Sequence, residues 1–211
     1  MIITFRLAWW QFDRANEKRV LEQHAQAGLR AEPLTVTTTV GIAPHRSAVV
    51  SGQYLPSHEI LLDNQVHQRR AGFHVITPLR LAGGDVIAIN RGWVAGDVSS
   101  RTAVPLPPPT GKVTVRGVLQ KDRSDAFTLS EQTENGNVWQ NLQLPKYAAT
   151  TGLPLLTLVL FAQDGDGVLA PAAVRINFKS AQSTAYAWQW LTFCALTLLF
   201  YILLGLKRKE S

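Results

Sequence analysis

Cysteine is nearly absent from this chain: its 211 residues contain one, Cys194. A single cysteine excludes an intrachain disulfide and leaves no CxxC pair for a redox or zinc site. The signatures GxSxG and HExxH are also missing, and the five histidines include no i, i+4 pair. The patterns that mark common hydrolases and metalloenzymes are therefore lacking, and we expect a protein that is not an enzyme.

Charge is missing from one long segment. Ala185–Leu206 comprises 22 residues without a charged side chain. A helix of that length rises about 33 Å, enough to cross the hydrocarbon core of a bilayer. Lys207, Arg208 and Lys209 follow at once, and basic residues beside a span stay on the cytoplasmic side. We expect a transmembrane helix at 185–206, a cytoplasmic tail at 207–211, and an outward-facing body before them.

A nucleic-acid partner is not expected, although the net charge is +6 and the pI is about 9.8. Outside the tail the positive residues are scattered, and no basic stripe interleaved with aromatic residues is present. Attraction to anionic membrane lipid accounts for the basicity.

The N-terminal segment MIITFRLAWW is apolar except for Thr4 and Arg6, and it is too short to span a bilayer alone. It also lacks the basic n-region and the cleavage site of a signal peptide. Two interpretations stay open: a short interfacial lead into the next helix, or the C-terminal half of a first span that is truncated here. We favour the second, because an outward-facing body needs an N-terminal export signal, and we assign 1–12 to the remnant of that span.

The body at 13–184 has the length of one domain. Good helix formers from Asp13 to Gly28 predict a helix, and Lys146–Thr151 predicts a short one. Short runs rich in Val, Ile and aromatic residues predict strands. These runs are Ser47–Tyr54, Glu59–Leu62, Gly72–Leu79, Val86–Asn90, Lys112–Gln120, Val138–Leu142, Leu155–Phe161 and Ala172–Asn177. The pattern predicts a mainly β fold, an antiparallel barrel or sandwich outside the membrane, bracketed by two transmembrane helices.

Three clusters combine aromatic with basic or polar side chains. Trp10, Arg14 and Lys18 share one helical face by their i, i+4 spacing. Asn90–Trp93 reads NRGW at the end of an apolar strand, and Tyr186–Trp190 reads YAWQW at the start of the C-terminal span. An aromatic belt at the membrane surface explains the first and third clusters, and a strand-end anchor explains the second.

Together these clusters resemble the Surfeit locus protein 1 family of cytochrome c oxidase assembly factors. The WQxxR signature of the family is similar to Trp10–Arg14, NRGW stands unaltered at Asn90–Trp93, and the closing Tyr-Ala-x-Gln-Trp pattern matches Tyr186–Trp190. Further matches, in the family order, are Gly52, Tyr54, Leu61, Leu62, Asn64, Gly72–Leu79, Val115–Val118 and Val138–Gln140. The matches extend over nearly the whole chain.

The resemblance implies a non-enzymatic role in building haem-copper oxidase, in which haem a is held transiently for insertion into the catalytic subunit. It implies that oxidase subunits are partners and that the protein lies in the bacterial inner membrane, multi-pass in its full-length form, with a periplasmic main domain. The implied haem contacts are aromatic and guanidinium side chains that converge near the bilayer. They are Trp10, Arg14, Arg91, Trp93, Tyr186 and Trp190.

Ser183 departs from the family pattern. The family commonly carries a histidine three residues before the closing tyrosine, where it is the natural axial donor to haem iron. In this sequence Ser183 stands at that position, three residues before Tyr186. The departure favours an alternative function, that of a cofactor-free, membrane-tethered scaffold for oxidase subunits.

Overall fold

The computed structural model describes residues 2–37, 42–97, 102–103, 107–122, 134–164, 169–171, 174 and 178–209. The chain divides into two compact units. Gly28–Val174 forms the sheet unit, and Met1–Ala27 together with Arg175–Ser211 forms the helix unit.

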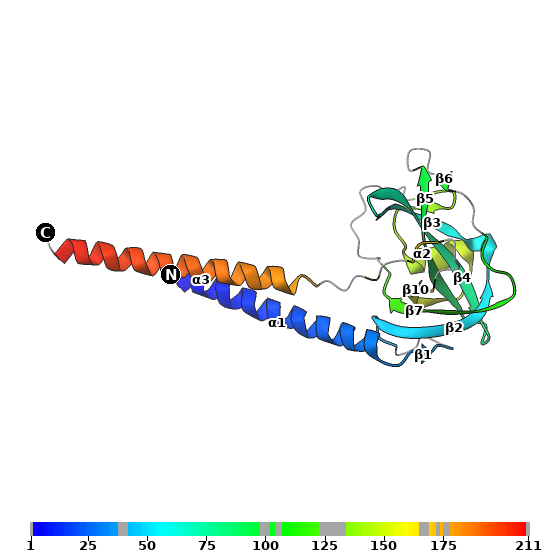
Figure 1. Ribbon diagram of the computed structural model, residues 1–211, viewed down its shortest axis with the longest axis horizontal. Coiled ribbons are helices and arrows are strands. Elements are labelled where there is room, and N and C mark those ends of the chain that lie inside the picture. Colours follow the sequence, from blue (N-terminus) through cyan, green and yellow to red (C-terminus); the bar gives the residue numbers. More distant parts are fainter. Residues whose placement is uncertain are drawn as a thin grey trace. The chain divides into compact units, whose positions relative to one another are not determined.

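The sheet unit is built on one mixed sheet with a short helix, α2 (Leu144–Thr151), and a 3₁₀ turn, η1 (Pro56–His58) (Figure 1). Its strands are β1 (Leu34–Thr35), β2 (Arg46–Tyr54), β3 (Ile60–His67), β4 (Arg70–Leu81), β5 (Val86–Asp97), β6 (Thr102–Ala103), β7 (Lys112–Gln120), β8 (Glu134–Asn135), β9 (Val138–Trp139) and β10 (Leu155–Ala162). Neighbouring strands follow the order β1-β2-β7-β10-β5-β4-β3-β9-β8, and β6 pairs with β5.

The sheet closes on itself, because β2 pairs with both β7 and β4. The path β2-β7-β10-β5-β4 therefore returns to its first strand. Strand β5 buries both of its faces: Ile87 and Ile89 belong to one core cluster, and Ala88 belongs to a second that includes Tyr147 of α2. Burial on both faces explains why Val86–Asn90 is apolar without a polar alternation.

The mainly β prediction is confirmed, with differences in detail. β7 has its predicted bounds, β2 and β10 each gain one residue, and the run predicted at Val138–Leu142 is a strand only at Val138–Trp139. The strand predicted at Ala172–Asn177 lies outside the described residues, except for Val174.

The expectation of purely antiparallel pairing needs correction. β1 and β2, β3 and β9, and β5 and β10 pair in parallel. Parallel neighbours require a crossover connection, and the long segment between β5 and β10, which includes β7 and α2, provides one. The local strand signals are the same for both directions, so only the course of the connections decides between them.

The helix unit contains α1 (Ile2–Arg30) as far as Ala27, together with α3 (Ser180–Lys209). The segment MIITFRLAWW is helical from Ile2 and continues without a break into the helix predicted from Asp13. Among the described helices, α3 is the one long and apolar enough to cross a membrane, with a mean hydropathy of 1.7 over its most apolar stretch. An apolar helix over Ala185–Leu206 is thus confirmed, and its composition indicates membrane association.

α1 and α3 run antiparallel. The rings of Phe12 and Trp188 meet edge to face with centroids 5.7 Å apart, and Lys18 Nζ donates a hydrogen bond to Ser183 Oγ at 2.8 Å. From Phe12 to Lys18 the contacts move toward the C-terminus of α1, whereas from Trp188 to Ser183 they move toward the N-terminus of α3. The antiparallel direction follows from this reversal.

Buried or half-buried side chains recur along the facing sides of both helices at alternating spacings of three and four. We call this set the seam: Thr4, Ala8, Gln11, Ala15, Lys18 and Glu22 on α1, and Ser180, Ser183, Ala187, Trp190 and Cys194 on α3. The alternation is the heptad spacing of paired helices. Small side chains at its centre, Ala8, Ala15 and Ala187, let the backbones approach closely.

Candidate functional site

The seam is polar near the start of α3, at the position where the sequence departs from the pattern of the family that it resembles. Ser183 is only 5% exposed, and its hydroxyl accepts the hydrogen bond from Lys18. The position of the family histidine therefore points into the contact between α1 and α3. A hydroxyl that already holds an ammonium group at this contact is not placed to bind iron.

Glu22 of α1 makes a second polar contact with α3, at the start of that helix. One carboxylate oxygen accepts the backbone N–H of Phe178 at 3.1 Å, and the other accepts the hydroxyl of Ser180 at 2.5 Å. A carboxylate beside the first turn of a helix is favoured by the positive end of the helix dipole. Glu22 thus ties the start of α3, and the residue two positions before it, to α1.

Trp10 and Arg14 lie on α1 away from the seam. Trp10 is 51% exposed, and the guanidinium carbon of Arg14 lies 5.8 Å from the centroid of its ring. Arg14 also approaches Glu17, with 3.6 Å between nitrogen and oxygen, while both side chains stay mostly exposed. The pair is therefore available to a ligand or partner of the helix unit.

The aromatic residues at the start of the apolar run of α3 are distributed around the helix. Tyr186 and Trp188 are exposed, and the Tyr186 hydroxyl accepts a hydrogen bond from Gln182 at 3.3 Å. Trp190 is half-buried and packs edge-on against Phe193, with ring centroids 5.9 Å apart. Their spread around the helix is typical of rings at a membrane surface.

A shallow, open hollow of about 570 Å³ lies on the exposed side of α1. Its lining residues are Phe5, Arg6, Trp9, Trp10 and Asp13. The hollow combines aromatic surface with one cation and one carboxylate.

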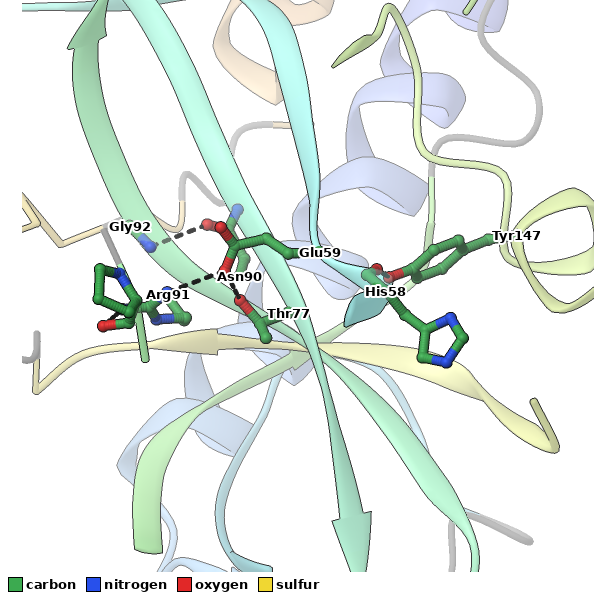
Figure 2. A network of polar contacts seen from close by, with 8 residues as sticks. His58, Glu59, Thr77, Asn90, Arg91, Gly92 and Tyr147 are labelled. Carbon is green, nitrogen blue, oxygen red and sulfur yellow. Dashed lines mark hydrogen bonds and ion pairs between the residues drawn. The ribbon is translucent and has the colours of Figure 1, made fainter. Parts of the chain in front are cut away.

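The NRGW segment lies in the sheet unit and is largely buried. Arg91 Nη1 donates to Glu59 Oε2 at 3.0 Å, and Thr77 Oγ1 donates to the same oxygen at 2.6 Å. The Arg91 side chain is 2% exposed and that of Glu59 is 18% exposed. Figure 2 shows Arg91 and Thr77 directed toward Glu59 from the neighbouring strands β5 and β4. The guanidinium thus serves a buried ion pair inside the sheet unit.

A β-bulge directs Arg91 into this position. In the pairing of β4 with β5, Val75 lies opposite Gly92 and Ile76 lies opposite Asn90, so Arg91 is the extra residue. A bulge of this kind locally turns a side chain out of the regular alternation. The Arg91 guanidinium also lies 5.7 Å from the centroid of the Tyr54 ring.

The other side chains of the segment also act within the sheet unit. Asn90 Oδ1 accepts the backbone N–H of Gly92 at 3.2 Å (Figure 2). Trp93 Nε1 donates to the Gln65 carbonyl at 3.0 Å, and its ring lies against that of His67 with centroids 5.2 Å apart. The segment therefore organises the β3-β4-β5 region.

Two glycines allow this packing. Gly92 has φ +142°, and a Cβ there would lie 2.5 Å from the Ala170 carbonyl oxygen. A Cβ on Gly72 would lie 2.2 Å from the Val94 carbonyl oxygen and 2.7 Å from the indole of Trp93. Real Cβ atoms do not approach so closely, so both positions require glycine.

Tyr147 of α2 extends the buried network toward η1. Its hydroxyl donates to the carbonyl of His58, the residue before Glu59 (Figure 2). Burial, and secondly the negative charge of Glu59, raise the pKa of the Tyr147 hydroxyl. The tyrosine therefore stays protonated and remains a hydrogen-bond donor.

The predicted site residues fall into two sets. Trp10, Arg14, Tyr186 and Trp190 belong to the helix unit, and Arg91 and Trp93 belong to the sheet unit. Sequence reasoning did not identify Glu59 or Glu22, because each acts through a partner remote in sequence. It placed Lys18 on one helical face with Trp10 and Arg14 but did not identify its contact with Ser183. Among the described residues, no group of three His, Cys, Asp or Glu side chains is arranged to hold a metal ion.

These features define a class: a membrane-associated protein in which a closed mixed sheet is inserted between two long helices. The model of the SURF1 family matches residues 1–195, and the chain belongs to this family. The resemblance found in the sequence is therefore confirmed.

Similar proteins carry the same family name. The SURF1-like protein of Rickettsia bellii is 24% identical over 210 residues, which cover 95% of this chain and 85% of that protein. The SURF1-like protein of Monosiga brevicollis is 25% identical over 222 residues, 98% of this chain and 85% of that protein. That of Caenorhabditis elegans is 24% identical over 229 residues, 95% of this chain and 70% of that protein.

Proposed function

We propose that this chain is a non-enzymatic, membrane-bound assembly factor for haem-copper cytochrome c oxidase. The observation that carries the proposal is the family match over residues 1–195, which includes all of α1, about the first half of α3 and the whole sheet unit. We take the closed strand path as a small barrel on the periplasmic side of a bacterial inner membrane. The basic residues Lys207–Lys209 favour a cytoplasmic C-terminus.

The residues present do not fit an iron site for haem a at the position that the family resemblance implies. Ser183 is buried against α1 and holds Lys18. Arg91 is committed to Glu59, and the indole nitrogen of Trp93 is committed to the Gln65 carbonyl. The geometry therefore supports a cofactor-free scaffold for oxidase subunits better than direct haem ligation.

Haem handling is the second candidate, and one observation favours it. Trp10 and Arg14 are exposed side by side on α1, where an indole can pack on a flat macrocycle and a guanidinium can pair with a carboxylate. Tyr186 is exposed on α3.

The decisive experiment purifies the tagged full chain in detergent from cells that make the oxidase. A colourless preparation that retains an oxidase subunit supports the scaffold. A Soret band that is lost in Trp10→Ala and kept in the matched variant Trp188→Ala supports haem handling. Normal oxidase levels after deletion of the gene would refute both forms of the assembly role.

Membrane topology is tested separately with reporters. A reporter fused after Ser211 is expected to be active only in its cytoplasmic form, and a reporter placed in the loop after β7 only in its periplasmic form. The opposite result would overturn the orientation while leaving the assembly role to the deletion experiment.

A further inference from the structure

Along the helix axes, Arg6 of α1 is level with the middle of the uncharged segment Ala185–Leu206 of α3. Phe12 and Trp188 are in contact, and the two helices are antiparallel. Six residues from Phe12 toward the N-terminus reach Arg6, and six residues beyond Trp188 reach Cys194. At 1.5 Å per residue this level is about 9 Å beyond the Phe12–Trp188 contact. Thr4 and Cys194, both half-buried, continue the seam to this depth.

Arg6 does not face α3. The seam residues nearest to it are Thr4 and Ala8, and Arg6 is two residues from each, about 200° around the helix. Its side chain is exposed, whereas Ala8 is 1% exposed. The ion pairs among the described residues are Arg14–Glu17 and Arg91–Glu59, so Arg6 takes part in neither.

The surroundings of Arg6 suit an apolar partner with one anionic group. Phe5, Trp9 and Trp10 line the same hollow of about 570 Å³. The other charged group of the hollow, Asp13, is seven residues away, about 10 Å along the helix axis. If α3 spans the membrane, Arg6 lies in the hydrocarbon region, where a cation is costly and characteristically pairs with an anion or reaches polar surroundings.

We infer that the face of α1 formed by Phe5, Arg6, Trp9 and Trp10 docks a transmembrane helix of a partner protein that carries an aspartate or glutamate at mid-membrane depth. The aromatic rings supply the apolar contact, and the Arg6 guanidinium pairs with the carboxylate. The occupant is a protein helix, because lipid phosphates lie at the membrane surface whereas Arg6 is level with the centre of the run. A second copy of the chain does not supply the anion, since Ala185–Leu206 contains no acidic residue and Asp13 lies near the membrane surface.

The inference rests on the proposed function for the membrane placement of α3, and it adds the partner surface. It is tested by zero-length cross-linking in native membranes with a membrane-permeant carbodiimide. This reagent activates a carboxylate, and a nearby amine then displaces the urea to form an amide. Arg6→Lys introduces the amine, and wild-type Arg6 does not react. Arg19→Lys is the matched control, at an exposed position of α1 outside the hydrocarbon region.

We expect a covalent adduct of Arg6→Lys that is absent from wild type and from Arg19→Lys. Mass spectrometry should locate the linkage at an Asp or Glu within an apolar segment of another protein. An adduct only with Asp13 of the same chain, or no adduct above the level of the two controls, would overturn the inference.

A second measurement uses charge removal. Arg6→Gln should reduce co-purification of the partner at least tenfold, and Arg6→Lys should restore most of it. Arg19→Gln, at an exposed position of α1, should leave co-purification unchanged, with all variants extracted from the membrane at equal levels. Loss of bound anionic phospholipid with full retention of the protein partner would overturn the inference in favour of a lipid contact. If oxidase assembly depends on the gene but Arg6→Gln has no effect, the docking surface fails alone. If deletion of the gene leaves assembly intact, the proposed function fails.

Discussion

The substitution Glu59→Gln tests whether the NRGW segment stabilises the sheet unit through its buried ion pair. The amide keeps the shape of the side chain and an oxygen that can accept from Thr77. It removes the negative charge that faces Arg91, whose side chain is 2% exposed. Because a guanidinium does not lose its proton in proteins, Arg91 remains a buried cation that has lost the carboxylate of Glu59.

The expected cost follows from this geometry. Breaking a buried ion pair by removing one partner costs about 3–5 kcal/mol. Glu59 is 18% exposed, and the Tyr54 ring lies 5.7 Å from the guanidinium, so water and the aromatic face offset part of the loss. We expect about 3 kcal/mol, the lower end of the range, and a fall in Tm of about 6–12 °C for a unit of this size.

The assay is unfolding of the full chain in detergent by urea and by heat, with near-UV circular dichroism as the signal that monitors unfolding. Glu17→Gln is the matched control, because Glu17 pairs with Arg14 but its side chain is 59% exposed. Such a surface pair contributes less than about 1 kcal/mol. If Glu59→Gln is no more destabilising than Glu17→Gln, the buried-pair argument is refuted. The double variant Glu59→Gln, Arg91→Met should recover part of the loss, because it also removes the buried cation.

Three further predictions concern packing, ionisation and the contact between Glu22 and the start of α3. Gly72→Ala should destabilise the sheet unit by about 2 kcal/mol or more in urea unfolding, because the new Cβ would overlap the indole of Trp93; a cost near zero would contradict this packing. The pKa of Tyr147 is raised in the folded state above its ordinary value of 10.0, so the free energy of unfolding should fall as the pH rises above 10. The variant Tyr147→Phe should show a smaller fall when unfolding is measured as a function of pH. Glu22→Gln should lower hydrogen-exchange protection at the start of α3 about tenfold, equivalent to about 1.4 kcal/mol, whereas Glu17→Gln should leave it unchanged.

Much of the fold was predictable because its signals are local. The strand runs at Ser47–Tyr54, Lys112–Gln120 and Leu155–Phe161 carry the side chains that strands prefer, and turn residues bound them. The same holds for α3, where length and lack of charge suffice. The NRGW match and the patterns around it were enough to recognise the family.

The contacts that the predicted site residues make were harder to predict from the sequence. Arg91 and Trp93 were expected to contribute to a ligand surface, yet their polar groups bond to Glu59 and to the Gln65 carbonyl. A motif shows which side chains are present, but it does not show whether a partner 32 positions away already binds them. Ser183 was noted as a departure, and its contact with Lys18 spans 165 positions.

The amino-acid sequence by itself determined the strand content, the apolar C-terminal helix and the family, because periodicity, composition and motifs act over a few neighbouring residues. Only the tertiary structure decided that β5 and β10 run parallel, that a bulge turns Arg91 toward Glu59, and that a heptad seam joins the two ends of the chain. Each of these depends on contacts between residues far apart in sequence, and such contacts form only when the whole chain has found its connections.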